Sequence, residues 1–200
     1  MRGRSVGGPR TGGAATVTIH EAVELLRSGS GAVREWNRWR RSSPPDTHRL
    51  ELHLADVDLS GLDLSGLVLH RSTLERVSLR AANLFHARIF GSRLDGCSFD
   101  RANLSEVRFV RSQLDGCSFR RASLARAALV HTQLLRCDFA AASLRGAELA
   151  HGTLRECALQ RADLRGATLS ARCFEASRFD RRTRWPTAFT PSAPGLEIDA

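Results

Sequence analysis

An apolar residue, always Leu, Ile or Phe, occupies every fifth position of the chain from Leu54 to Phe179. This ladder holds for 26 successive positions without a break. A period of five matches neither the 3.6 residues per turn of a helix nor the alternation of a flat strand. We therefore expect the chain to turn a corner every five residues and to point each fifth side chain into an interior. An amphipathic helical protein, the alternative, does not produce this period.

A second period of 20 residues is superimposed on the first. It is carried by four cysteines, each two residues before a ladder position, and by three ladder phenylalanines: Cys97, Cys117, Cys137, Cys157, Phe99, Phe119 and Phe139. A superperiod of 20 means that four five-residue sides close one coil, so that each residue stacks on its counterpart in the next coil. Stacked coils can pair their backbone groups as strands do, with a rise of ~4.8 Å and a total length of roughly 31 Å.

Several stretches of the ladder resemble the pentapeptide-repeat family, whose consensus is A-(D/N)-L-x-x. The matching segments are Leu59–Gly66, Ala82-Asn83-Leu84, Ala102-Asn103-Leu104 and Ala162–Gly166. The resemblance implies an all-β solenoid, a right-handed quadrilateral β-helix. With four repeats per coil, the ladder would make about 6.5 coils, and both open ends would need caps.

The expected organisation has four parts: a leader at 1–15, a helical N-terminal cap at 16–49, the β-helix at 50–180, and a C-terminal cap and tail at 181–200. The Gly- and Arg-rich leader has no apolar pattern and is predicted to be disordered. No segment resembles a signal peptide or a membrane span. Because four of the five cysteines point inward, a reducing compartment and a cytoplasmic location are expected.

Two short motifs resemble the segments that close other pentapeptide-repeat proteins. The run Trp36-Asn37-Arg38-Trp39-Arg40 is similar to a W-N-x-W-R segment found ahead of many such repeats. That resemblance implies that Trp36 and Trp39 cover the first coil, although a tryptophan pair that binds a partner stays an alternative. Near the other end, Trp185 and Phe189 lie in a stretch similar to a T-x-W-P-x-x-F-D-P tail and are expected to plug the last coil. Thr190 replaces the usual acid.

Catalytic and metal-binding signatures are not found in the sequence. There is no Gly-rich phosphate loop, no G-x-S-x-G motif and no paired carboxylates. His131 and His151 share one column of the repeat, but no third metal ligand accompanies them. We therefore predict a protein that is not an enzyme and that has no cofactor and no metal.

The resemblance also suggests a partner, because the best-known bacterial members bind DNA gyrase or topoisomerase IV and protect them from quinolones or natural-product poisons. An acidic rod is implied to imitate DNA in that role. This chain has a net charge of +9, and all 30 of its basic residues are Arg. A basic rod attracts DNA rather than replacing it. No insertion interrupts the repeats, so a mechanism that depends on projecting loops is not expected.

Local charge keeps DNA mimicry open as an alternative. Glu75, Asp95 and Asp115 are expected to stack in one acidic column. The neighbouring side carries the basic face, which consists of Arg101, Arg120, Arg121 and Arg161. The acidic column and the basic face are therefore predicted to lie on adjacent sides of the rod.

An apolar stripe is predicted on another side, where the residues that follow the inward ones are Phe90, Val110 and Val130. Phe85 lies one corner earlier, on the neighbouring side. One interpretation is that the cap or the tail folds over this stripe, or that these apolar surface residues have no function. The other is that the stripe is a homodimer or partner interface.

Three functions follow in order of preference. The first is a non-catalytic protein-binding rod that works through its outer faces, and the second is a gyrase- or topoisomerase-protecting protein. The third is an Arg-rich rod that binds nucleic acid. It ranks last because base stacking needs exposed aromatic residues between the arginines.

Overall fold

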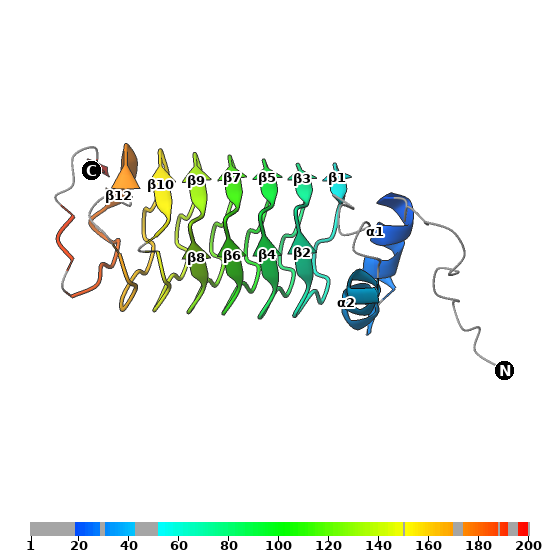
Figure 1. The fold of residues 1–200 in the computed structure, drawn as a ribbon. Coiled ribbons are helices and arrows are strands. Elements are labelled where there is room, and N and C mark those ends of the chain that lie inside the picture. Colours follow the sequence, from blue (N-terminus) through cyan, green and yellow to red (C-terminus); the bar gives the residue numbers. More distant parts are fainter. Residues whose placement is uncertain are drawn as a thin grey trace.

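The computed structural model describes residues 19–28, 31–42, 52–149, 151–169, 174–187, 189–191 and 196–199. The predicted leader, 1–15, lies outside these residues. The chain forms a straight rod of stacked coils with two helices at its N-terminal end (Figure 1). The rod is a right-handed β-solenoid of about six turns, which confirms the predicted fold class.

The two helices form the N-terminal cap. Helix α1 spans Ile19–Arg27 and α2 spans Ala32–Ser42. Val23 and Leu26 of α1 and Trp36 of α2 are buried together with the first coils. No helix in the described part of the chain is long and apolar enough to cross a membrane.

One side of the rod is a seven-stranded parallel sheet in the order β1-β3-β5-β7-β9-β10-β11, along the upper edge of Figure 1. Its strands are β1 His53–Ala55, β3 Thr73–Glu75, β5 Arg93–Asp95, β7 Gln113–Asp115, β9 Gln133–Leu135, β10 Thr153–Arg155 and β11 Phe174–Glu175. The adjoining side is a four-stranded parallel sheet in the order β2-β4-β6-β8. Its strands are β2 Val68–His70, β4 Arg88–Phe90, β6 Arg108–Val110 and β8 Ala128–Val130.

Strands that follow one another in either sheet are offset by 20 residues. In the seven-stranded sheet Leu74 pairs with Leu94, and in the four-stranded sheet Ile89 pairs with Phe109. The other two sides contain isolated parallel bridges with the same offset, such as Ser98 with Ser118. The superperiod of the sequence is therefore the coil length of the solenoid.

The corners of the coil need left-handed backbone. Gly61 has a φ of 70°, and Arg121, at the equivalent corner three coils later, has a φ of 58°. A non-glycine residue in this region costs of order 1–3 kcal/mol unless its surroundings hold it there. The backbone hydrogen bonds to neighbouring coils provide that restraint, as when the Arg121 amide donates to the Ala140 carbonyl at 3.0 Å.

The ladder residues fill the interior. Phe99, Phe119 and Phe139 stack with ring centroids 4.8 Å apart, and the planes of successive rings differ by 2° and 3°. This spacing matches the distance between hydrogen-bonded strands. Each ring therefore stacks on its counterpart in the next coil, and the three phenylalanines form one continuous column.

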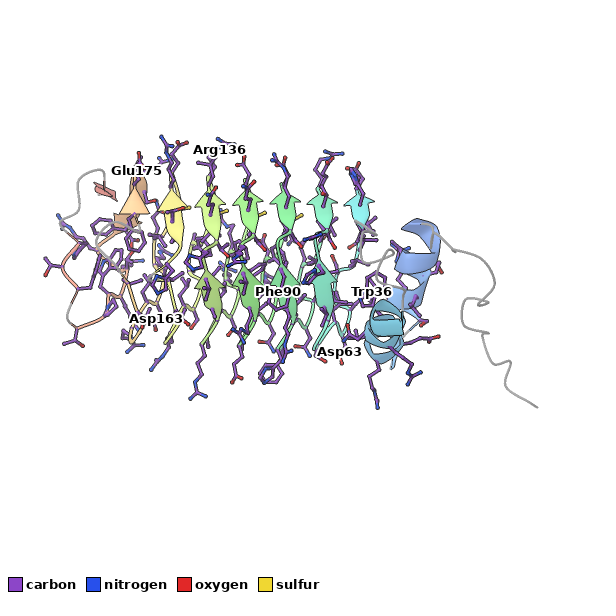
Figure 2. All side chains as sticks on the ribbon, in the orientation of Figure 1. Trp36, Asp63, Phe90, Arg136, Asp163 and Glu175 are labelled. Carbon is purple, nitrogen blue, oxygen red and sulfur yellow. The ribbon has the colours of Figure 1, made fainter. Side chains whose placement is uncertain are left out.

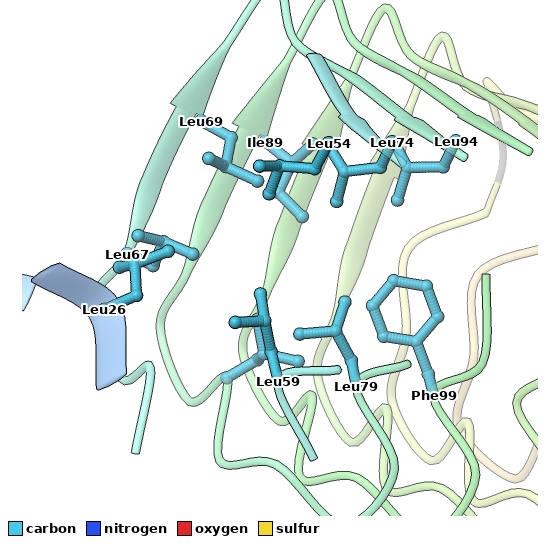
Figure 3. Close-up of a pocket in the computed structure, with 11 residues that line it drawn as sticks. Leu26, Leu54, Leu59, Leu67, Leu69, Leu74, Leu79, Ile89, Leu94 and Phe99 are labelled. Carbon is cyan, nitrogen blue, oxygen red and sulfur yellow. The ribbon is translucent and has the colours of Figure 1, made fainter. Parts of the chain in front are cut away.

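Packing is looser in the first coils, where the same column continues as leucine. A cavity of about 10 Å³ lies between the cap and the first phenylalanine (Figure 3). Its lining includes Leu26 of the cap, Leu59, Leu79 and Phe99. All of its lining residues are apolar, so the cavity offers a water molecule no hydrogen-bond partner.

The C-terminal end is closed by aromatic rings. Trp185 packs edge-on against Phe174 and Phe179, at centroid distances of 5.5 and 5.3 Å, and stacks on Phe189 at 5.1 Å. Strand β12, Ser177–Asp180, pairs in parallel with β13, Leu196–Asp199. The plug and this added strand terminate the repeat.

Candidate protein-interaction surface

The apolar stripe, Phe90, Val110 and Val130, runs along the four-stranded sheet. Phe90 pairs with Val110 and Val110 with Val130, so the three side chains lie in one column across β4, β6 and β8. All three are half-buried. Figure 2 shows Phe90 on the side of the rod, away from both ends. The next residue of the column toward the cap is His70, whose ring centroid lies 5.6 Å from that of Phe90.

Arginines border the stripe on both sides. Arg88 and Arg108 stand two residues before Phe90 and Val110, in register on β4 and β6. Arg71 and Arg111 stand at the corner that follows the sheet. All four side chains are exposed, and none forms an ion pair with a carboxylate among the residues that the structure describes. We call Arg71, Arg88, Arg108 and Arg111 the arginine flanks.

The described caps lie beyond the two ends of the stripe. Trp36 of α2 donates a hydrogen bond from Nε1 to the Val68 carbonyl at 3.1 Å, which fixes the helices against β2 at the first coil. Strand β13 pairs with β12 near the opposite end. In Figure 1 the helices and β13 extend the rod at its ends and leave the middle of the four-stranded sheet open. The described parts of the cap and tail thus do not cover the stripe.

Phe85 lies on the neighbouring side, apart from the stripe. Among the described residues it is the large apolar side chain with substantial exposure, at 38%. Its ring meets the edge of the His86 ring at 4.3 Å, and His86 lies 3.0 Å from Glu106. Phe85 is therefore an isolated exposed ring rather than part of a larger apolar surface.

The three residues of the acidic column occupy paired positions on neighbouring strands, but basic side chains border them. Glu75 pairs with Asp95 and Asp95 with Asp115 in the ladder of the seven-stranded sheet. Arg76 lies 3.8 Å from Glu75, Arg93 lies 3.8 Å from Asp95, and Arg136 contacts Asp115.

Each carboxylate of the column thus has a basic side chain within ion-pair distance. Arg136, which bonds Asp115, is labelled along the upper edge of Figure 2. These basic neighbours reduce the negative potential that a DNA mimic needs.

The basic face divides into one paired and three unpaired arginines. Arg120 forms an ion pair with Asp138 at 3.0 Å. Arg101, Arg121 and Arg161 are exposed at corners of one column, in which Ala141 separates Arg121 from Arg161. All three have positive φ and form no ion pair within the described chain. The basic charge of this side is therefore concentrated at its corner.

The N-terminal cap contains a residue whose role sequence reasoning missed. Asn37 donates from Nδ2 to the Gly66 carbonyl at 2.8 Å and accepts from the Val68 amide at its Oδ1 at 3.0 Å. The Asn37 side-chain amide thus forms the hydrogen bonds to the first coil that the backbone of a preceding coil would otherwise form. The position of Asn37 beside Trp36 in the W-N-x-W-R segment was the available signal. The side chain of Trp39 lies outside the described residues.

The cysteine column consists of buried thiols that are shielded from reaction. Cys97, Cys117, Cys137 and Cys157 are all buried and free. The contact with the Cys117 thiol, together with burial, holds the pKa of Cys97 well above its usual value. The His131 and His151 rings lie with centroids 5.5 Å apart and planes tilted by 37°, but no group of three or more metal-ligating residues occurs in the described portion.

The family model described as "Pentapeptide repeats" matches eight copies, in segments 53–89, 82–121, 122–161, 133–170 and 142–179. The chain belongs to the pentapeptide-repeat family. Those segments span the whole solenoid, while the helical cap and the aromatic plug lie outside them. No curated protein matches the sequence.

Solved structures of other pentapeptide-repeat proteins are similar to this chain. HetL of the cyanobacterium Nostoc sp. strain PCC 7120, involved in heterocyst differentiation regulation, is 18% identical over 74% of this chain and 87% of HetL, with a TM-score of 0.44. The protein alr5209 of Nostoc PCC 7120 is 24% identical over 65% of this chain and 84% of its own, with a TM-score of 0.34. Full-length QnrB1, a plasmid-mediated fluoroquinolone resistance protein, is 15% identical over 74% and 92%, with a TM-score of 0.31.

Proposed function

We propose that this pentapeptide-repeat protein is a non-catalytic rod that binds another protein through its outer faces. The observation that carries the proposal is the apolar stripe, which crosses three neighbouring strands and is not covered by the described caps. Rows of apolar side chains on an otherwise polar surface are typical of protein-binding sites. Proteins of this family are typically structural and interaction modules, which supports a binding function.

A rigid sheet suits this role. The inward neighbours of the stripe, Ile89, Phe109 and Leu129, are at most 1% exposed, so the backbone beneath it is fixed by the core. A surface that is already ordered loses little conformational entropy when it binds. The buried thiols agree with a cytoplasmic location, which we include in the proposal.

Protection of DNA gyrase or topoisomerase IV remains the second candidate function. The three stacked carboxylates of the acidic column support it, but each has an arginine within 4 Å. The net charge of +9 opposes it further, because the enzyme's DNA-binding groove attracts negative charge. Binding of nucleic acid to the unpaired corner arginines ranks third.

The test of the first candidate is site-specific photocrosslinking. Benzoylphenylalanine replaces Val110 in one version of the protein and Gln113, on the neighbouring sheet, in a control version. After irradiation in an extract of the source organism, we expect a discrete adduct from position 110 and none from position 113. Equal labelling from both positions, or no adduct from position 110, would contradict the proposal.

A gyrase supercoiling assay tests the second candidate. The purified protein is titrated with and without a quinolone, and the variant with Asp95→Arg and Asp115→Arg serves as the matched comparison. Inhibition or drug protection that is lost in this variant would support a gyrase-directed function. Indifference in both conditions would remove it.

A further inference from the structure

We propose that the four-stranded sheet binds an acidic amphipathic α-helix, laid along the rod with its apolar seam on Phe90, Val110 and Val130. This inference rests on the proposed protein-binding function and names the class of partner. Its basis is the combination of an apolar stripe with arginine flanks that have no carboxylate partner of their own among the described residues.

The flanks differ from most other arginines that face outward from the two sheets. Elsewhere on the rod, Arg76 pairs with Asp56 at 2.7 Å and Arg155 lies 3.6 Å from Glu175. These arginines are neutralised within the fold, so they offer little net charge to a partner. The arginine flanks keep their full charge. A partner that supplies carboxylates on both sides of an apolar seam would therefore match this surface.

The spacing of the stripe favours a helix over an extended segment. Successive residues of the stripe come from successive coils, which are ~4.8 Å apart. One turn of an α-helix rises about 5.4 Å, so apolar residues on three successive turns reach all three stripe residues with small drift. Alternate residues of an extended strand are about 6.6 Å apart and would lose register. The backbone groups of the middle strands are already paired, so strand addition is not available there.

The lateral dimensions also fit. Arg88 and Arg108 stand two residues before the stripe along their strands, a distance of about 6.6 Å. Arg111 stands at the opposite border, one residue beyond Val110, and Arg71 stands one residue beyond His70, the next residue of the column toward the cap. On a helix, residues three or four positions from the apolar seam lie at the sides of the contact. Glutamates at those positions would reach the guanidinium groups while the seam stays on the stripe.

A second copy of this chain is a poorer occupant. Face-to-face pairing of two sheets would bring four flank arginines from each copy to one interface. Glu148 is the carboxylate that continues the column of Arg88 and Arg108, through its bridge to Ala128. Eight arginines would therefore meet two such glutamates, and the excess of like charge opposes the dimer.

Nucleic acid is also a poorer occupant. A single strand needs aromatic platforms for its bases, and the stripe contains one aromatic residue and two valines. Phosphates would form ion pairs with the arginines, but Val110 and Val130 would have no apolar group to contact.

The test measures binding of two designed peptides by fluorescence anisotropy. The first is a stapled helix of about 15 residues with a leucine seam flanked by glutamates, and the second has lysines in place of those glutamates. We expect the glutamate peptide to bind at least about tenfold more tightly at low salt. Rising ionic strength should reduce that difference. Equal binding of both peptides, or no binding of the glutamate peptide, would overturn the inference.

Variants locate the site. The double variant Arg88→Glu with Arg108→Glu changes exposed side chains, so it should fold normally and reverse the preference toward the lysine peptide. Val110→Glu should lower the affinity for the glutamate peptide by about tenfold or more. Gln113→Glu on the adjoining sheet serves as the matched control and should leave this affinity unchanged. A preference that survives the double charge reversal would place the peptide elsewhere and refute the site.

Two further measurements separate the other occupants. If analytical ultracentrifugation detected a dimer and Val110→Glu dissociated it, a second copy of the chain, not a helix of another protein, would be the occupant of the stripe. If an oligothymidine bound more tightly than the glutamate peptide, and the double variant lost this binding, nucleic acid would be the occupant instead of the helix. A photocrosslinked partner whose contact segment is basic, like the lysine peptide, would refute this inference and leave the proposed function standing. Failure of crosslinking at position 110 would remove the proposed function itself.

Discussion

Phe99 stacks on Phe119 with ring centroids 4.8 Å apart and planes within 2° of parallel. The same column continues toward the cap as Leu79 and Leu59, and the apolar cavity begins there. We expect Leu79→Phe to extend the stack into the cavity and to raise the free energy of unfolding by about 1 kcal/mol. Urea unfolding followed by circular dichroism measures this change.

Leu134→Phe is the matched control. Leu134 is equally buried but lies on another side of the core and does not line the cavity. A larger side chain there should overpack the interior and lower the free energy of unfolding by about 1–3 kcal/mol. If Leu79→Phe were as destabilising as this control, the cavity would not accommodate a ring.

Asn37→Ala should loosen the N-terminal end of the rod. The substitution leaves the Gly66 carbonyl and the Val68 amide without their cap partner, at a cost of about 1–3 kcal/mol. Hydrogen exchange should accelerate in the first coil and stay unchanged in the coils beyond the phenylalanine column. Arg34→Ala, an exposed position on the same helix, should leave exchange as it is. Uniform acceleration along the rod would show that Asn37 does not act at the end alone.

The cysteine column should be inert in the folded protein. The thiolate is the reactive form, and the neighbouring thiol together with burial raises the pKa of Cys97. In a Cys173→Ser variant, which removes the cysteine outside the described residues, a disulfide reagent such as DTNB should not react under native conditions. In denaturant, all four remaining thiols should react. Rapid modification of the native protein would contradict a buried column.

Asp163 should make stability depend on pH in the acid range. Its carboxylate accepts hydrogen bonds from Arg165 Nε and Nη2 at 2.9 and 2.7 Å, and these bonds lower its pKa to about 2. Because the folded-state pKa is depressed, this stabilisation is complete above the ordinary pKa of about 3.9 and is lost as the pH falls toward 2. Figure 2 places Asp163 along the lower edge of the rod, toward its C-terminal end.

Asp163→Asn should therefore cost about 1–2 kcal/mol at pH 7, a value reduced from the full shift because Arg165 is partly exposed. The difference from the unmodified protein should shrink between about pH 4 and pH 2. Glu148→Gln, at an exposed carboxylate without an ion pair among the described residues, should change stability by less than about 0.5 kcal/mol at any pH. A constant Asp163→Asn penalty down to pH 2 would contradict the charge-based origin.

Most of the fold could be predicted because the repeat leaves the chain one way to bury its ladder. Leu94 and Phe119 are interior in every arrangement that has a period of five and four sides, and the structure places both there. The stripe could be located for the same reason, since Phe90 follows an inward residue and must point outward. The role of Asn37 could not be predicted, because its partners Gly66 and Val68 are about 30 residues away and belong to a coil that has no repeat above it.

The architecture, the interior columns and the outward register of each side follow from the two nested periods, because these periods specify which residues stack. Which charged side chains are available to a partner became clear from the folded structure. It placed Arg93 and Arg136 beside Asp95 and Asp115, and it left Arg88 and Arg108 without a carboxylate in the described chain. Ion pairing depends on side-chain directions at corners and between coils, and the period of the sequence does not specify these directions.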